Sequence, residues 1–141
     1  LVDHASGWFD QGGGDFQSRH VYFKKLSARI PDDRILAVTE FGGYSLKTPD
    51  HMWDEDKKFG YRFYNSPAAL EKGYFDLIEK QVEPLIPLGL SAAIYTELTD
   101  VETEINGYLT YDRKAEKMDA NSLFDLHQRL INWREHKSVT Q

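Results

Sequence analysis

The chain contains 141 residues, of which 40% are hydrophobic, and carries a net charge of -6. This length and composition predict one domain with a hydrophobic core, spanning residues 1–141, and exclude a disordered tail. The excess of acidic residues argues against a nucleic-acid-binding surface. Cysteine is absent, which excludes disulfides and thiolate metal sites, and no apolar run approaches the ~18 residues that a membrane helix needs.

The N-terminal residues 1–6 are predicted to be the end of a strand. Because the sequence opens abruptly in this segment, without a signal peptide, we expect a piece of a larger protein. The lack of cysteine fits a reducing compartment, so the cytoplasm is expected rather than secretion. A glycine-rich loop that includes residues 12–14 follows, and residues 15–22 are predicted to form a second strand.

The most informative segment is RILAVTEFGGY, residues 34–44. A run of small and β-branched residues bounded by Pro31 and two glycines predicts a third strand, residues 35–40, that is buried on both faces. In parallel α/β barrels the reacting groups lie at the C-terminal ends of such strands. Glu40 lies at that point and is therefore the candidate nucleophile.

A long loop rich in aromatic residues is predicted over residues 41–65. Loops of this length are uncommon unless they are functional or disordered, and the aromatic content argues against disorder. Ser66 is predicted to cap a helix that has Pro67 at its first position. Pro84 and Pro87 are predicted to kink or end that helix.

A fourth strand is predicted over residues 90–95, followed by an acidic loop over residues 101–111 and a final helix capped near Asp119. The order strand, strand, strand, helix, strand, helix favours an α/β fold with a parallel sheet. Four strands with two helices predict half of an eight-stranded TIM barrel, and a small open α/β sheet is the alternative.

Carboxylates lie at or near three predicted strand ends, at Asp3, Glu40 and Glu97. A retaining glycosidase uses two carboxyl groups roughly 5–5.5 Å apart, one as nucleophile and one as acid and base. Adjacent barrel strands could bring Glu40 and Glu97 near that spacing. A salt bridge or a helix cap is the structural alternative for any such glutamate, and for Glu97 a structural or supporting role is favoured.

Aromatic side chains suited to packing on sugar rings lie near the predicted loop face: Trp8, Tyr22, Tyr44, Trp53 and Tyr95. Packing in the core or in loops is their structural alternative. His4 and His20 lie near strand ends, where a lone histidine is usually a hydrogen-bonding structural residue. No metal-ligand spacing such as HExxH occurs, and the GxSxG, P-loop and dinucleotide-binding patterns are missing, so no metal or other cofactor is predicted.

Four segments together resemble one known family. Residues 39–43, TEFGG, resemble the nucleophile segment of glycoside hydrolase family two, the β-galactosidase and β-glucuronidase relatives. Residues 2–8, VDHASGW, resemble its fifth barrel strand and loop, and residues 15–22, DFQSRHVY, its sixth strand. Residues 94–107, IYTELTDVETEING, resemble the eighth strand and the loop after it. The matching segments span nearly the whole chain in the family's order.

The resemblance implies a retaining β-glycosidase, of which this chain supplies barrel strands five to eight. Glu40 would be the nucleophile that forms the glycosyl-enzyme intermediate, and Tyr22 would hydrogen-bond to it. His20 would lie where a polar residue lines the sugar site. Asp3 and Trp8 would border the glycone pocket.

The chain departs from the family at two points. Tyr95 falls where close relatives often have tryptophan. The family's acid/base is a glutamate preceded by asparagine, and this chain contains no Asn-Glu dipeptide. The resemblance therefore implies an acid/base upstream of Leu1 and no significant glycosidase activity of this chain alone, since leaving-group protonation is typically worth about 10²–10⁴-fold.

The expected partners are a carbohydrate substrate, the missing N-terminal half of the barrel and, through open sheet edges, a second copy of the chain. No nucleic-acid or membrane partner is expected. A non-catalytic carbohydrate-binding module is the alternative function, because it would use the same aromatic residues without needing Glu40. A small open α/β domain with an interaction role would explain the strands but not the loop aromatics. The acidic balance argues against an anionic sugar.

Overall fold

Three parallel strands form the main sheet of the computed structural model, which describes residues 1–4, 7–27 and 33–133. They are β1 (Phe16–Val21), β2 (Ile35–Gly42) and β5 (Leu90–Thr96), and their spatial order is β1, β2, β5. Each strand lies where the sequence predicts one. The predicted α/β class with a parallel sheet is therefore confirmed, and the carboxyl ends of the three strands meet at one edge.

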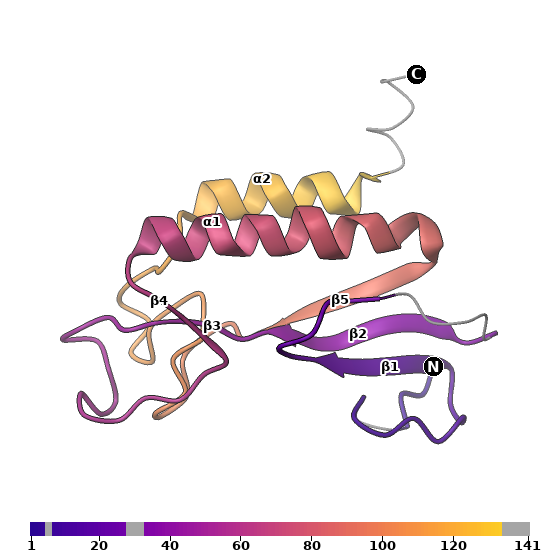
Figure 1. Cartoon of the computed structure of the whole chain (residues 1–141), viewed down its shortest axis with the longest axis horizontal. Coiled ribbons are helices and arrows are strands. Elements are labelled where there is room, and N and C mark those ends of the chain that lie inside the picture. The colour runs from indigo at the N-terminus through magenta and orange to yellow at the C-terminus, as the bar shows by residue number, and fades with distance from the viewer. Residues whose placement is uncertain (5–6, 28–32, 134–141) are drawn as a thin grey trace.

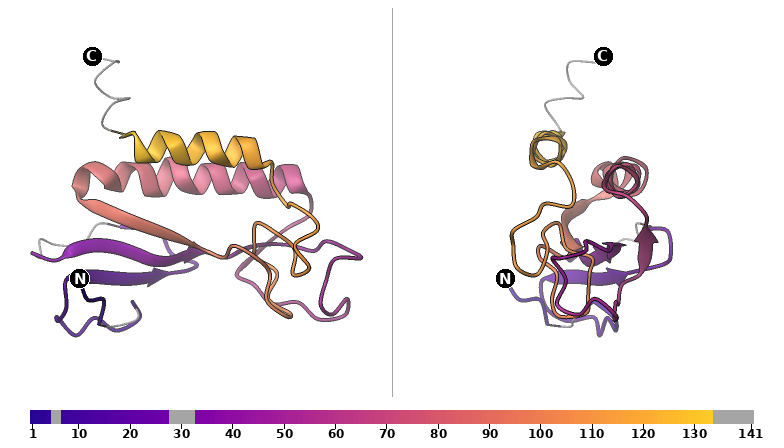
Figure 2. Two further views of the ribbon diagram at one scale, coloured as in Figure 1. Left: turned by 180° about the vertical axis from the view of Figure 1, so that it is seen from behind. Right: turned by 90° about the vertical axis from the view of Figure 1, so that its left-hand side faces the viewer.

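Both helices lie on the same face of this sheet, side by side (Figure 1, Figure 2). α1 (Pro67–Leu77) continues through a π-helical segment, Ile78–Val82, into a 3₁₀ segment, Glu83–Leu88. Ser66 caps α1 as predicted, because its hydroxyl accepts a hydrogen bond from the backbone N–H of Ala69 at 3.2 Å.

The prolines lie where the first helix tightens and ends. Pro84 and Pro87 are both in the 3₁₀ segment, where each lacks the N–H that an α-helix would use. The helix stops at Gly89, whose φ of 102° lies in the left-handed region that favours glycine.

α2 (Ala120–Ile131) begins after Asp119, whose carboxylate accepts a hydrogen bond from the backbone N–H of Ser122 at 2.7 Å. Its buried face carries Leu123 and Leu126, as the leucine spacing predicts. Within the described ranges, the helices are too short and too polar to cross a membrane.

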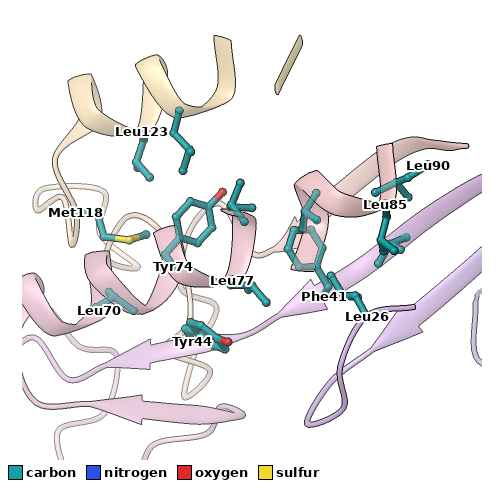
Figure 3. Close-up of a cluster of buried hydrophobic side chains, with 14 of the residues drawn as sticks. Leu26, Phe41, Tyr44, Leu70, Tyr74, Leu77, Leu85, Leu90, Met118 and Leu123 are labelled. Carbon is teal, nitrogen blue, oxygen red and sulfur yellow. The ribbon is translucent and has the colours of Figure 1, made fainter. Parts of the chain in front are cut away.

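The hydrophobic core lies between the sheet and the two helices (Figure 3). Its members include Leu36, Val38 and Phe41 of β2, Leu70, Tyr74 and Leu77 of α1, and Leu123 and Leu126 of α2, together with others such as Leu26, Tyr44, Leu85, Leu90 and Met118. Both helices pack on one face of the sheet, and Glu40 and its neighbours lie on the opposite face.

The main sheet is open in the part of the chain that the structure describes. β1 and β5 are its two edge strands, and they do not pair with each other. Three parallel strands with helices on one face are compatible with part of a barrel and equally with a small open sheet. The finer prediction of a half TIM barrel therefore stays a prediction.

The predicted N-terminal strand is not present as a strand over residues 1–4, which are exposed; residues 5–6 lie outside the described residues. Two backbone hydrogen bonds nevertheless connect residues of the N-terminal region to β1 and to the residue before it. The N–H of Asp15 donates to Val2 at 2.7 Å, and the N–H of His20 donates to Gly7 at 3.0 Å.

The prediction of one long loop over residues 41–65 is wrong in part, because this segment contains two short strands. β3 (Tyr44–Leu46) and β4 (Arg62–Tyr64) form a second, two-stranded parallel sheet. Three residues are too few to show an alternating pattern in the sequence. This small sheet and the loop after β5 gather beyond the carboxyl ends of the main strands (Figure 1).

Candidate functional site

Glu40 lies at an irregularity of β2. Val38 pairs with Arg19 of β1, but Glu40 already pairs with His20, so Thr39 is an extra residue of a β-bulge. The pairing of β2 with β5 also shifts by one residue between Val38 and Phe41. Because of it, Val38 and Phe41 both reach the core under the helices, and Glu40 projects from the opposite face beside His20.

One carboxylate oxygen of Glu40 receives two polar contacts. The hydroxyl of Tyr22 donates a hydrogen bond to Oε2 at 2.9 Å. The Nδ1 atom of His20 lies 3.1 Å from the same oxygen, at an angle that does not make a hydrogen bond. The His20 side chain is 8% exposed, whereas that of Glu40 is 40% exposed. Tyr22 and His20 thus contact the carboxylate from the side of the sheet, and its other side is exposed to solvent.

Tyr22 is held in turn by its surroundings. Its oxygen lies 2.8 Å from the hydroxyl of Thr96, at the end of β5, and its ring stacks on Tyr61 at 3.8 Å. Burial raises the pKa of Tyr22 well above its usual range, and the neighbouring Glu40 carboxylate raises it further. The phenol therefore stays protonated and donates to Glu40 at all ordinary pH values.

Trp8 borders this group, as the sequence predicts. Its ring lies edge-on to His20 at 5.4 Å and tilted over Tyr22 at 6.0 Å, and 56% of the residue is exposed. Gly7 makes this approach possible: its φ is 68°, and a Cβ there would lie 2.3 Å from the His20 ring. Trp8, His20, Tyr22 and Glu40 are thus the predicted site residues that the structure brings together.

Asp3 lies away from this cluster. It follows Val2, which is bonded to Asp15 at the start of β1, whereas Glu40 pairs with His20 near the end of that strand. β1 has six residues that rise about 3.3 Å each, so Asp15 and His20 lie far apart along the strand. The exposed Asp3 carboxylate therefore does not border Glu40 in this structure.

Tyr44, Tyr95 and Trp53 do not join the cluster either. The Tyr95 hydroxyl accepts from the backbone N–H of Tyr44 at 2.9 Å, and both residues pack against the core. Trp53 is 61% exposed and lies edge-on to Tyr111 at 5.7 Å. Tyr44 and Tyr95 thus fit the packing alternative, and Trp53 lies on the surface outside the cluster.

Tyr61 is a member of the cluster that the sequence reasoning missed. It stacks on Tyr22, and Gly43 allows this approach, since a Cβ at Gly43 would lie 2.2 Å from the Tyr61 ring. Burial raises the pKa of Tyr61, and the carboxylates of Glu104, Glu40 and Glu97 raise it too. The aromatic run of the predicted loop was the available signal, but nothing in it singled out Tyr61.

The loop after β5 adds two carboxylates beside Tyr61. Burial, followed by the charges of Glu104 and Asp100, raises the pKa of Glu97 to about 7. Glu104 accepts a hydrogen bond from the side-chain amide of Asn106 at 3.0 Å, and the backbone N–H of Glu97 donates to the Asn106 carbonyl at 3.3 Å. Of these, only Glu97 was considered from the sequence, in a supporting role.

A buried ion pair anchors this loop. Lys117 Nζ lies 2.7 and 2.6 Å from the two carboxylate oxygens of Asp100, and both side chains are almost fully buried. Lys117 also donates to the carbonyl of Ile105 at 3.1 Å, and the N–H of Gly107 donates to Asp100 at 2.8 Å. Buried charges need such pairing, and here it fixes the course of residues 100–107.

The carboxylate of Glu40 can act as a nucleophile or as a hydrogen-bond acceptor toward a molecule that approaches from solvent. A hollow of about 430 Å³ is lined by Tyr22 and Tyr61 but not by Glu40, whose side chain is 40% exposed. In the described ranges, no three His, Cys, Asp or Glu side chains come together as a metal site requires.

Comparison of the chain with protein-family models and with curated proteins gives no match.

Proposed function

We propose that the chain supplies the nucleophile of a retaining β-glycosidase, and that Glu40 is that nucleophile. The observation that carries the proposal is the Glu40 carboxylate at the carboxyl end of the central parallel strand, with one oxygen bound by Tyr22 and one side open to solvent. Reacting groups occupy this end of the strands in α/β barrels. The resemblance to glycoside hydrolase family two supports the same assignment.

In this reaction, a Glu40 oxygen attacks the anomeric carbon of a β-glycoside, the bond to the leaving group breaks, and a glycosyl-enzyme ester forms that water then hydrolyses. Tyr22 and His20 stabilise and orient the carboxylate. Trp8 offers an exposed aromatic face for the sugar. We propose that the acid/base is contributed by sequence upstream of Leu1, in the other half of a TIM barrel, whose interior the Glu40 face of this sheet would line.

The proposal is tested on the full reading frame that contains this chain, assayed for hydrolysis of 4-nitrophenyl β-glycosides. We expect Glu40→Gln to lower kcat by more than about 10³-fold, because the neutral amide cannot form the ester intermediate. The matched control is Glu55→Gln, which changes an exposed glutamate in the loop after β3. It should retain the parent's activity.

A second variant separates a lost nucleophile from a lost fold. In Glu40→Ala, added azide can occupy the space of the carboxylate and attack the anomeric carbon itself. The product expected with the activated 4-nitrophenyl leaving group is the α-glycosyl azide. Full activity of Glu40→Gln would contradict the proposal and favour a carbohydrate-binding module.

A further inference from the structure

A hollow of about 430 Å³ lies between the segment after β1, residues 22–26, the first helix and the small sheet of β3 and β4. Its buried lining includes Leu26, Phe41 and Leu77 of the hydrophobic core (Figure 3). Sites for small organic molecules have volumes of about 300–1,000 Å³. Glu40 does not line this hollow, which is therefore a candidate ligand site separate from the proposed nucleophile.

The walls of the hollow are fixed by contacts between segments that are distant in the sequence. The backbone N–H of Leu26 donates to Oε1 of Gln81 at 3.1 Å, which ties the segment after β1 to the π-helical part of the first helix. Tyr61 stacks on Tyr22 at 3.8 Å and lies edge-on to Phe23 at 5.4 Å. Walls that are already ordered reduce the entropic cost of binding a ligand.

Three cationic side chains line the hollow, whereas no aspartate or glutamate does. They are Lys24, Lys25 and Arg62, and all three are exposed. Among the described residues, none of the three forms a salt bridge with a carboxylate. The hollow therefore has positive charge that the surrounding chain does not neutralise.

This absence of counter-charge is unusual in a chain with 23 acidic and 17 basic residues. Lysines elsewhere lie beside carboxylates: Lys47 pairs with Glu55, Lys57 with Asp54, and both Lys72 and Lys80 with Asp76. Positive groups that line one hollow without counter-ions attract an anion to it.

Hydrogen-bond donors reach the hollow from three segments. The Arg62 guanidinium lies over the rings of Tyr44 and Tyr64, 5.4 and 5.3 Å from their centroids, which restrains its position and leaves the N–H groups along its edge available. Because Gln81 accepts from Leu26 through Oε1, its side-chain NH₂ group is a further donor. Arginine and lysine donors together suit a tetrahedral oxyanion such as phosphate.

We infer that this hollow binds a phosphate monoester of a small aromatic molecule, with the phosphate on Lys24, Lys25 and Arg62. Phe23 and Tyr61 provide aromatic faces for the organic part. The hollow also has room for it, since a water molecule takes only about 30 Å³ of liquid volume. The site is independent of the proposed glycosidase function, because its ligand does not contact Glu40.

Calorimetric titration of the full reading frame that contains this chain tests the site, with phenyl phosphate as the probe. We expect phenyl phosphate to bind at least about tenfold more tightly than inorganic phosphate or phenol, each of which offers only half of the interactions. Arg62→Gln and Lys24→Gln should each weaken its binding at least about tenfold, because each removes a charge-assisted hydrogen bond. Both side chains are exposed, so both variants should fold as the parent does.

Lys58→Gln is the matched control. Lys58 is exposed and lies over the ring of Phe63 at 4.8 Å, and it does not line the hollow. The control changes the net charge equally and should leave the dissociation constant unchanged. Equal weakening by all three substitutions would indicate attraction to the general surface charge and overturn the site. Inorganic phosphate or phenol that binds as tightly as phenyl phosphate would overturn the assignment of a phosphate monoester.

Discussion

At Glu40, the Tyr22 hydroxyl and the His20 ring approach the same carboxylate oxygen, at 2.9 and 3.1 Å. The other oxygen has no such contact from these two residues. A nucleophile needs one oxygen free to attack while its partner keeps the group ionised and oriented, and this asymmetry meets that need. The low exposure of His20 and the stacking of Tyr22 on Tyr61 restrict both contacts to one geometry.

We predict that Tyr22→Phe lowers kcat/KM of the full reading frame by about tenfold to a hundredfold. A hydrogen bond to a charged group is worth about 1.5–3 kcal/mol, and this one orients the attacking carboxylate. The measurement is steady-state hydrolysis of a 4-nitrophenyl β-glycoside. Tyr111→Phe, which alters a hydroxyl beside Trp53, is the control. An unchanged kcat/KM for Tyr22→Phe would show that this bond has no catalytic role.

Glu97 carries a second prediction, on pH and stability. Its pKa of about 7 in the folded chain lies above the ordinary value of 4.5. Between these values the folded state binds more protons than the unfolded state, so the contribution of Glu97 to stability is complete below about pH 4.5 and falls as the pH rises toward 7. Glu97→Gln should remove this component.

Urea unfolding of the wild type and of Glu97→Gln between pH 5 and pH 8 measures the pH-dependent contribution of Glu97 to the free energy of unfolding. We expect the variant to gain stability relative to the wild type as the pH rises. Parallel pH profiles for the two proteins would mean that Glu97 ionises as an ordinary exposed carboxyl group does.

At the scale of single residues, strand position predicted which side chains lie together, whereas residue type alone did not predict which aromatic residues lie beside them. Glu40, Tyr22 and His20 lie at or just beyond the carboxyl ends of strands whose pattern is visible, so their common edge could be predicted. Tyr44 and Tyr95 lie equally near strand ends, but their rings turn into the core. Which face an aromatic residue occupies beside a bulge depends on the irregular register of β2, and no periodicity reports that.

Among the elements, the helices and main strands were predictable because each has its own local signal. Ser66 and Asp119 are caps, and β2 is a short apolar run before two glycines. The small sheet of β3 and β4 was missed because its pairing joins two segments across an intervening loop. Non-local pairing of three-residue strands leaves no pattern within either segment.

The loop after β5 depends on a single buried pair, which yields a stability prediction. Lys117→Met should lower the free energy of unfolding by about 3–5 kcal/mol, because it leaves the Asp100 carboxylate buried without a cation. Urea denaturation measures this change. The matched control is Lys80→Met, which removes an exposed lysine paired with Asp76 at 2.7 Å and should cost no more than about 1 kcal/mol. Equal effects of the two substitutions would refute a structural role for the buried pair.

For the molecule as a whole, the arrangement of layers leaves one sheet edge accessible. The helices cover one face of the sheet (Figure 2). β5 forms an edge of the sheet, and its residues Ser91, Ala93 and Ile94 are exposed. Exposed strand edges invite pairing with another chain. The face that bears Glu40 is likewise not covered by a helix of the described residues (Figure 2).

We predict that the isolated chain associates through this edge, and that Ile94→Lys weakens the association. A lysine on an edge strand disfavours strand pairing, and Ile94 is 56% exposed, so the monomer should tolerate the change. Sedimentation velocity at several concentrations compares the two proteins. A wild-type chain that stays monomeric throughout would contradict the prediction.

The half barrel, the sugar substrate and an acid/base outside this chain are proposals that rest on the resemblance alone. An open sheet of three strands does not distinguish a barrel segment from an open α/β domain, because both place helices on a face and carboxylates at strand ends. A covalent reaction at Glu40 would distinguish the barrel segment of a glycosidase from a small open α/β domain.

Trapping the covalent intermediate tests that chemistry most directly. The full reading frame is incubated with an activated 2-deoxy-2-fluoro-β-glycoside, digested, and examined by mass spectrometry. The fluorine slows both formation and hydrolysis of the glycosyl-enzyme ester, whereas the activated leaving group speeds formation alone, so the adduct accumulates. The account predicts one fluoroglycosyl group, on Glu40. An adduct on another residue, or turnover of the parent glycoside with no adduct at all, would contradict it.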